Sequence, residues 1–157
     1  MRRLASLATL GLVLTACASS PPPVQTAATS RDPEIRAIYN VLVAFQHALV
    51  TRDGDALAKL MAGPDIVLRS RAVDSGQVFS STAEVFTKSV TESKESWEEQ
   101  FANVVITARD GIATLDSDYK FLAGGKQTNH GREVWTLIRA GTDWKISMIT
   151  WSIIADH

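Results

Sequence analysis

Few of the residues that could do chemistry in this 157-residue chain have the spacing that a known type of site requires. The histidines His47, His130 and His157 lie far apart, and the single cysteine, Cys17, has no partner, so the spacing favours no metal site. The sequence contains no phosphate loop, dinucleotide-binding fingerprint or nucleophile elbow. We therefore expect neither a metal nor a cofactor.

Two acidic residues, Asp116 and Asp118, are candidates for general acid–base catalysis. They occupy the polar face of a segment in which apolar and polar residues alternate, as in a half-buried strand. A positioned carboxylate can take a proton from a substrate, but a solvated strand face is the simpler interpretation. The acidic stretch 91–99 is also interpreted as a solvated face, and Trp97 within it belongs either to a pocket mouth or to the core.

The N-terminus has the pattern of an export signal. Arg2 and Arg3 precede a short apolar segment, 4–14, which is too short to span a bilayer. The sequence Leu-Thr-Ala-Cys that ends at Cys17 resembles the bacterial lipobox, which implies lipid attachment at this cysteine. Ala18 after it implies, by the same resemblance, the periplasmic face of the outer membrane. The alternative is an ordinary cleaved signal with a chance cysteine.

Composition limits the rest of the chain to one domain on a tether. Residues 18–32 are polar and rich in proline, so we expect a flexible tether. Residues 33–157 are long enough for one domain with its own core. A formal charge of −1 and a pI of 6.3 give no electrostatic reason to expect nucleic-acid binding.

Helices are predicted in the first half of this domain. Asp32 and Pro33 are typical of a helix start. Asp53 and Gly54 then separate the first helix from a shorter second one, and Ser81 caps a third that extends to about residue 96. The first helix has an apolar stripe at helical spacing: Ile35, Ile38, Leu42, Phe45 and Leu49.

Strands are predicted in the second half, at 101–108, 112–122, 131–139 and 144–154. The last two flank a turn rich in Gly, Thr and Asp, and large apolar residues occur on both faces of the final strand. Something must therefore cover both faces. Helices followed by a meander of strands favour an α+β fold with the helices on one face of a curved antiparallel sheet.

The domain resembles the NTF2-like superfamily, in particular its SnoaL-like or DUF4440-type bacterial members. The resemblance rests on Asp53-Gly54-Asp55 with the helix after it, on Asp110-Gly111 and Gly131-Arg132 at strand starts, and on Trp144-Lys145-Ile146 in the last strand. It implies a cone in which the sheet wraps the long N-terminal helix, with two further helices. The cone leaves a pocket at its wide end.

The resemblance also implies which side chains face that pocket. Arg132 would point inward and could hold a carboxylate through two N–H groups; the alternative is an ion pair with Glu84 or Glu133. Relatives that act on protons often have a histidine where this chain has Thr150, which lowers the expectation of catalysis. The expected ligand-binding residues are Tyr39, Trp97, Tyr119, His130, Arg132 and Thr150.

The same facing leaves an apolar patch on the outside of the sheet, and such a patch usually marks an interface. We expect a homodimer, unless the register is reversed or another element covers the patch. The expected contact residues are Trp135, Leu137, Ile149, Trp151 and Ile153.

Three functions follow from these expectations. The first is non-catalytic binding of a small apolar or carboxylated molecule, or of a protein partner, by a lipid-anchored envelope protein. The second is a lyase or isomerase of the SnoaL or ketosteroid isomerase type, which would need an inward acid or base beside a hydrogen-bond donor. The third is a structural dimer whose cone is filled by its own side chains.

Overall fold

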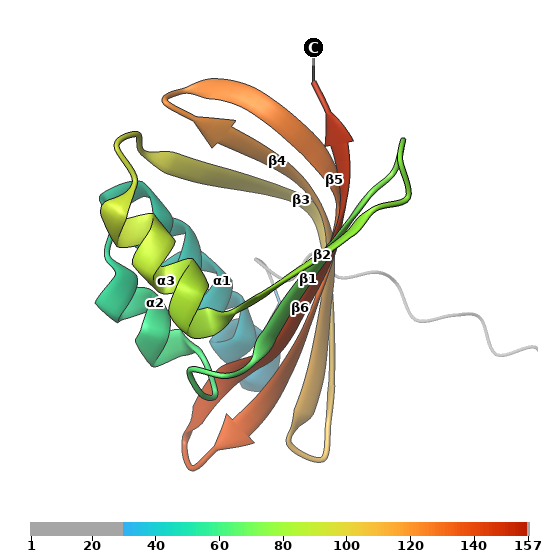
Figure 1. Cartoon of the computed structure of the whole chain (residues 1–157). Helices are drawn as coiled ribbons and strands as arrows, with labels where there is room; N and C mark the ends of the chain where they lie inside the picture. The colour runs from blue at the N-terminus through green and yellow to red at the C-terminus, as the bar shows by residue number, and fades with distance from the viewer. Residues whose placement is uncertain (1–29, 157) are drawn as a thin grey trace, which may run out of the picture.

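The computed structural model describes residues 30–156, which form three helices and one six-stranded sheet (Figure 1). The expected signal segment, the lipidation site Cys17 and most of the expected tether lie outside the described residues. Within 30–156, no helix is both long and apolar enough to cross a membrane. In chain order the elements are α1 (Pro33–Thr51), α2 (Gly54–Leu60), β1 (Val67–Ala72), β2 (Val78–Thr82), α3 (Ala83–Glu92), β3 (Trp97–Arg109), β4 (Ile112–Ala123), β5 (Lys126–Ala140) and β6 (Asp143–Ala155).

The sheet has the strand order β2-β1-β6-β5-β4-β3 and bends around the helices. Figure 1 shows all three helices on its concave side, with β3 and β4 arching over them. The expected α+β cone is thus confirmed. One detail differs, because β1 pairs with β6 in parallel and the sheet is mixed. These two strands are not consecutive in the chain, so no hairpin turn imposes an antiparallel direction on them.

Helix α1 presents its apolar stripe to the concave face, as predicted. Asp32 caps it by accepting a hydrogen bond from the Glu34 backbone N–H at 2.8 Å. The ring of Phe45 meets the indole of Trp135 edge to face, with centroids 4.8 Å apart. The buried residues of this helix are Ile38, Val41, Leu42, Phe45, Ala48 and Leu49.

Helix α3 begins and ends differently from the prediction. Its cap is Thr82, the last residue of β2, whose hydroxyl accepts from the Val85 N–H at 3.3 Å; Ser81 pairs with Leu68 one position earlier in the strand. The helix ends at Glu92, and β3 already begins at Trp97, so the acidic segment contributes to a strand of the sheet.

A β-bulge at Ser147 explains why both faces of the final strand carry large apolar residues. Leu137 pairs with Ile146 and Thr136 pairs with Met148, which leaves Ser147 as the extra residue. Its hydroxyl donates to the carbonyl oxygen of Thr136 at 3.0 Å. The bulge reverses the alternation, so the inward residues are Trp144 and Ile146 before it and Ile149, Trp151 and Ile153 after it.

The predicted facing of β5 is wrong by one residue. Trp135 and Leu137 are fully buried against the helices, and Glu133 beside them is 3% exposed. Arg132 consequently lies on the outer face, where its side chain is exposed. Both registers place apolar residues inside; the observed one buries the larger Trp and Leu side chains and therefore more apolar surface.

The expected outer patch does not exist as predicted, because Trp135, Leu137 and Ile149 are buried. Trp151 and Ile153 are half-buried and line an internal cavity. The homodimer stays a prediction, but without these contact residues. The outer face of β5 and β6 instead carries Val134, Thr136, Ile138, Met148 and Thr150.

Gly131 permits a close approach between β5 and β6 where the sheet bends. A Cβ at this position would lie 2.2 Å from the carbonyl oxygen of Ser152, closer than real Cβ atoms come to a backbone atom. The same carbonyl accepts a hydrogen bond from the Tyr119 hydroxyl at 2.9 Å. Glycine is therefore required here by space, and the strand next to the cavity depends on it.

We expect Gly131→Ala to lower the free energy of unfolding by about 1–3 kcal/mol, because the new methyl group must displace backbone. Urea denaturation of the purified chain measures the change. Gly63→Ala is the control, since its Cβ would meet only the flexible Asp65 carboxylate, at 2.9 Å. Equal stability of Gly131→Ala and the unmodified chain would contradict the steric argument.

Candidate functional site

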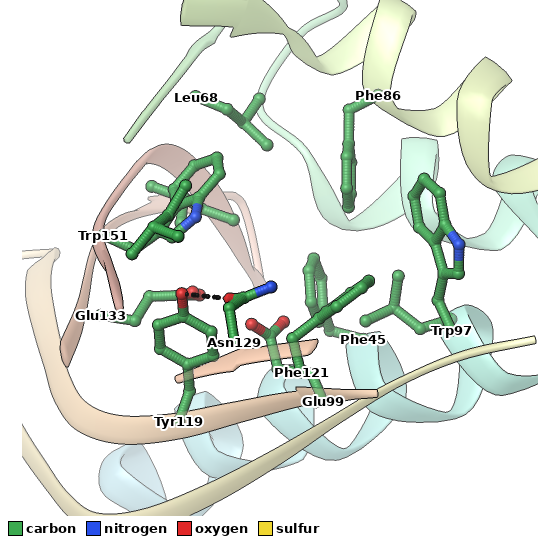
Figure 2. Close-up of a pocket in the computed structure, with 13 residues that line it drawn as sticks. Phe45, Leu68, Phe86, Trp97, Glu99, Tyr119, Phe121, Asn129, Glu133 and Trp151 are labelled. Atoms are coloured by element: carbon green, nitrogen blue, oxygen red, sulfur yellow. Dashed lines mark hydrogen bonds between the residues drawn. The ribbon is translucent and has the colours of Figure 1, made fainter. Parts of the chain in front are cut away.

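An internal cavity of about 280 Å³ lies between the concave face of the sheet and helices α1 and α3 (Figure 2). Nine of its residues are apolar: Phe45, Leu49, Leu68, Phe86, Trp97, Phe121, Ile149, Trp151 and Ile153. Four are polar: Glu99, Tyr119, Asn129 and Glu133. Elements from the whole length of the domain contribute, so the cavity exists only in the folded chain.

Aromatic rings form one continuous wall of this cavity. Phe45 of α1 stacks on Phe86 of α3 with centroids 6.1 Å apart, and Phe86 lies 6.5 Å from Trp97 of β3. Trp97 in turn meets Phe121 of β4 at 5.7 Å. Ring pairs at these distances attract each other through their quadrupoles, and the wall is therefore fixed in shape.

Two carboxyl groups interrupt the apolar lining. Glu99 of β3 is 8% exposed and Glu133 of β5 is 3% exposed. Figure 2 shows the carboxyl oxygens of Glu99 directed into the middle of the lining side chains. Glu133 accepts a hydrogen bond from the indole N–H of Trp135, two residues along the same face. Burial of a carboxyl group without a partner is costly, so the two groups must be stabilised by sharing a proton or by a bound group.

Burial raises the pKa of both carboxyls. The pKa of Glu99 lies well above its usual 4.5 because of burial, the neighbouring charge of Glu133 and a hydrogen bond to Glu133. Burial raises the pKa of Glu133 to about 7, against the opposing effect of the hydrogen bonds from Trp135 and Glu99. Near neutral pH the Glu99–Glu133 pair thus holds at least one proton, which the two carboxyls share.

Tyr119 of β4 lies between the two carboxyl strands and joins a polar network. Its hydroxyl is 2.8 Å from the side-chain oxygen of Asn129 and 2.9 Å from the backbone oxygen of Ser152. Burial and the charges of Glu99 and Glu133 raise the pKa of Tyr119 above its usual value, so it stays a neutral donor. The network holds Asn129 at the cavity wall, as Figure 2 shows.

The structure brings two of the predicted ligand-binding residues to this cavity, Trp97 and Tyr119. Tyr39 is half-buried near the start of α1 and lines a separate surface hollow with Pro33 and Arg36. Thr150 is exposed on the outer face of the sheet.

Arg132 does not reach the cavity, so the expected clamp for a carboxylate is wrong. Its side chain bonds Asp116 on the outer face, with Nε 2.8 Å from Oδ1, and this hydrogen bond lowers the pKa of Asp116. The ion-pair alternative holds with a partner other than Glu84 or Glu133. Asp118 accepts from Asn103 at 2.6 Å on the same face, in agreement with the solvated-face interpretation.

His130 also lies outside the cavity. Its Nδ1 is 3.0 Å from a carboxylate oxygen of Asp156 at the end of the chain that the structure describes. It borders a groove on the outer face of the sheet together with Arg132, Lys120 and Ile154. Lys120 and Arg132 line this groove and not the cavity that holds the carboxyl pair.

Sequence reasoning missed Glu99, Asn129 and Glu133. One signal for Glu99 was present: it shares a strand face with Trp97 and Phe101, but the acidic residues around it favoured a solvated segment. The facing predicted for β5 places Glu133 outside, next to Trp135. It is correct that these two residues share a face of the strand, but that face is the inner one.

The site can bind a small molecule, and it can also place an acid and a base beside it. A protonated and an ionised carboxyl in one apolar cavity suit proton transfer near neutral pH. Within residues 30–156, no group of three His, Cys, Asp or Glu side chains is arranged to hold a metal ion.

The sequence matches no protein-family model, and no curated protein matches it. The structure, by contrast, is similar to solved structures of NTF2-like proteins. An NTF2-like protein from Cytophaga hutchinsonii has a TM-score of 0.64 at 12% identity, with 78% of this chain and all of that chain covered.

Two structural neighbours are proposed dehydratases. A proposed scytalone dehydratase from Novosphingobium aromaticivorans has a TM-score of 0.62 at 17% identity, covering 77% of this chain and 84% of its own. A proposed dehydratase of the NTF2-like family from Streptomyces avermitilis has a TM-score of 0.61 at 16% identity, covering 80% and 99%. At these identities the likeness shows the NTF2-like fold and leaves the reaction open.

The raised pKa values predict an unusual dependence of stability on pH. The folded chain keeps a proton that an unfolded glutamate releases near pH 4.5, so the free energy of unfolding falls as pH rises from 4.5 to about 7. We expect Glu133 alone to give a fall of about 3 kcal/mol over this range, measured by chemical denaturation at several pH values.

The double variant Glu99→Gln/Glu133→Gln should lose this fall, because it has no proton to release. Glu98→Gln is the matched control: this neighbouring glutamate is half-buried and its side chain accepts from Gln100 at 2.7 Å. An unchanged pH profile in the double variant would show that the pair does not titrate as described.

Proposed function

We propose, from the NTF2-like fold of this chain and the contents of its cavity, that the protein binds a small molecule inside the cone. The observation that carries the proposal is an apolar cavity with two buried carboxyls and a polar network in its wall. Binding sites for small molecules are concave and mostly apolar, with a few polar groups that orient the ligand.

The size of the cavity restricts the ligand. A volume of about 280 Å³ lies near the lower end of the range for ligand pockets. It suits a small molecule of about one or two rings. The filled-cone alternative, a purely structural domain, is less well supported because this space stays open beside polar groups.

The lining also bears on the charge of the ligand. A carboxylated ligand was expected on the basis of an inward Arg132, which faces outward instead. A carboxylate in the cavity would meet Glu99 and Glu133 and be repelled. The proposed ligand therefore has a largely apolar body and no negative charge, with a polar group that interacts with the carboxyl pair.

A second candidate function is an acid–base enzyme, a lyase or isomerase. It is favoured by the carboxyl pair, since Glu133 would take a proton from carbon and protonated Glu99 would give one to a leaving hydroxyl. The two proposed dehydratases among the structural neighbours support the same class. Turnover of a β-hydroxy carbonyl compound that is lost in Glu133→Gln, while binding is retained, would favour the enzyme over the binding protein.

A variant that fills the cavity tests binding directly. We expect Ile153→Trp to weaken binding of any cavity ligand at least about tenfold, because the larger ring occupies the space. Ligand-observed NMR with a set of single-ring compounds identifies a ligand, and titration calorimetry compares the variants. Ile138→Trp is the matched control, since Ile138 is 38% exposed on the outer face. Compounds that bind both variants equally, or a set without any binder, would contradict the proposal.

We also propose that the protein is a lipoprotein of the bacterial cell envelope, anchored through Cys17 at the periplasmic face of the outer membrane. The support is the export signal and the Leu-Thr-Ala-Cys sequence alone.

We expect Cys17→Ala to abolish lipid attachment, because the thiol is the only sulfur nucleophile of its kind in the sequence. Metabolic labelling with palmitate and fractionation of membranes measure the loss. Ser19→Ala should stay labelled and membrane-bound. An unlabelled wild-type chain would show that the segment is an ordinary signal.

A further inference from the structure

The buried carboxyl pair has no cationic partner in the part of the chain that the structure describes. Neither Glu99 nor Glu133 takes part in any of its ion pairs, and no Lys, Arg or His is among the described residues that line the cavity. Buried charges in proteins are normally paired. A proton shared by the two carboxyls leaves the pair with one negative charge, and loss of that proton leaves it with two. Neither charge has a cationic partner among the described residues.

Other acidic groups of the domain do have cationic partners. Asp116 pairs with Arg132 on the outer face, and Glu34 of α1 pairs with Arg139 at 2.6 Å. The basic residues of these two ion pairs, Arg132 and Arg139, lie at the surface of the folded domain. Among the described residues, the cavity holds the two buried carboxyl groups, Glu99 and Glu133, and neither has a cationic partner.

The aromatic wall faces this same charge. Rings of Phe45, Phe86, Trp97 and Phe121 follow one another around the cavity, and Trp151 lies on its β6 side. The face of an aromatic ring attracts cations, and desolvation inside a cavity strengthens this attraction. The rings and the carboxyls therefore favour the same kind of ligand, one with a positive charge on an apolar body.

We propose that the ligand of this cavity is an organic cation: a protonated or quaternary amine whose alkyl groups pack on the aromatic wall and whose charge is balanced by the Glu99–Glu133 pair. The inference rests on the proposed function, since it names the class of molecule that the same cavity would bind. A quaternary ammonium fits the lining better than a metal ion, which would need several oxygen ligands in place of rings.

A cation at this position predicts a pH dependence. The titratable groups that face the pair are Tyr119 of β4 and the two glutamates themselves; the lining residues of α1, α3, β1 and β6 are all apolar. A bound cation favours the ionised form of Glu133, whose pKa is about 7 without it. Binding then releases protons, and affinity rises with pH through this region.

Three molecules of one shape and different charge test the inference on the purified full chain. Choline is the cation, and neohexanol (3,3-dimethyl-1-butanol) is its neutral counterpart with carbon in place of nitrogen. The anionic counterpart is tert-butylacetate, the carboxylate anion 3,3-dimethylbutanoate. We expect titration calorimetry at about pH 8 to show choline binding at least about tenfold tighter than neohexanol, with tert-butylacetate weakest. At about pH 5.5 the preference for choline should shrink.

Glu133→Gln should remove the preference for choline, because it weakens choline binding much more than neohexanol binding, whereas damage to the fold would weaken both by the same factor. Glu98→Gln should behave like the wild type. Equal binding of choline and neohexanol, both lost in Ile153→Trp, would overturn the organic cation and leave the binding function intact. Absence of binding by all three would also overturn it, and the screen of single-ring compounds then decides the binding function separately.

Discussion

The interior of this domain depends on one hydrogen bond, between the indole N–H of Trp135 and the carboxyl of Glu133. Trp135 lies at the centre of the core, where Phe45 of α1 and Phe101 of β3 pack edge to face on it. A fully buried indole needs an acceptor for its N–H. Residue 133 is two positions away on the same face of β5 and provides that acceptor. The large aromatic residue that joins the helices to the sheet thus has a carboxyl group as its acceptor inside the core.

The buried carboxyl then determines the electrostatics of the cavity. Glu133 is accompanied by Glu99 from β3, and burial raises the pKa of both groups, so the pair holds protons near neutral pH. Tyr119 remains a neutral donor between them. Without a basic residue in the described lining, the negative charge of the pair is available to a ligand. The proposed binding function, the acid–base alternative and the proposed preference for a cation all rest on this one arrangement.

The shape of the cavity comes from irregularities in the strands. The bulge at Ser147 reverses the facing of β6, so that Ile146 packs in the closed end of the core and Trp151 lines the open space. A second bulge in β3, between Ala102 and Val105, follows the half of the strand that carries Glu99. Such bulges increase local bending. A regular sheet with the same residues would be flatter and would place these side chains on different faces.

The sequence by itself determined the class of fold, the face of α1 that is buried and the strands from β3 to β6. These follow from periodicity and capping, which act over a few neighbouring residues. It could not determine which face of β5 is inward, because both faces carry β-branched or aromatic residues, and the choice depends on packing against Phe45 from a distant helix. For the same reason the predicted facing placed Arg132 inside and Glu133 outside, whereas the bulge at Ser147 turned Thr150 outward and the acidic residues around Glu99 favoured a solvated segment. Only the tertiary structure decided the site, since burial and the distance between strands create its chemistry, and neither is a property of a local segment.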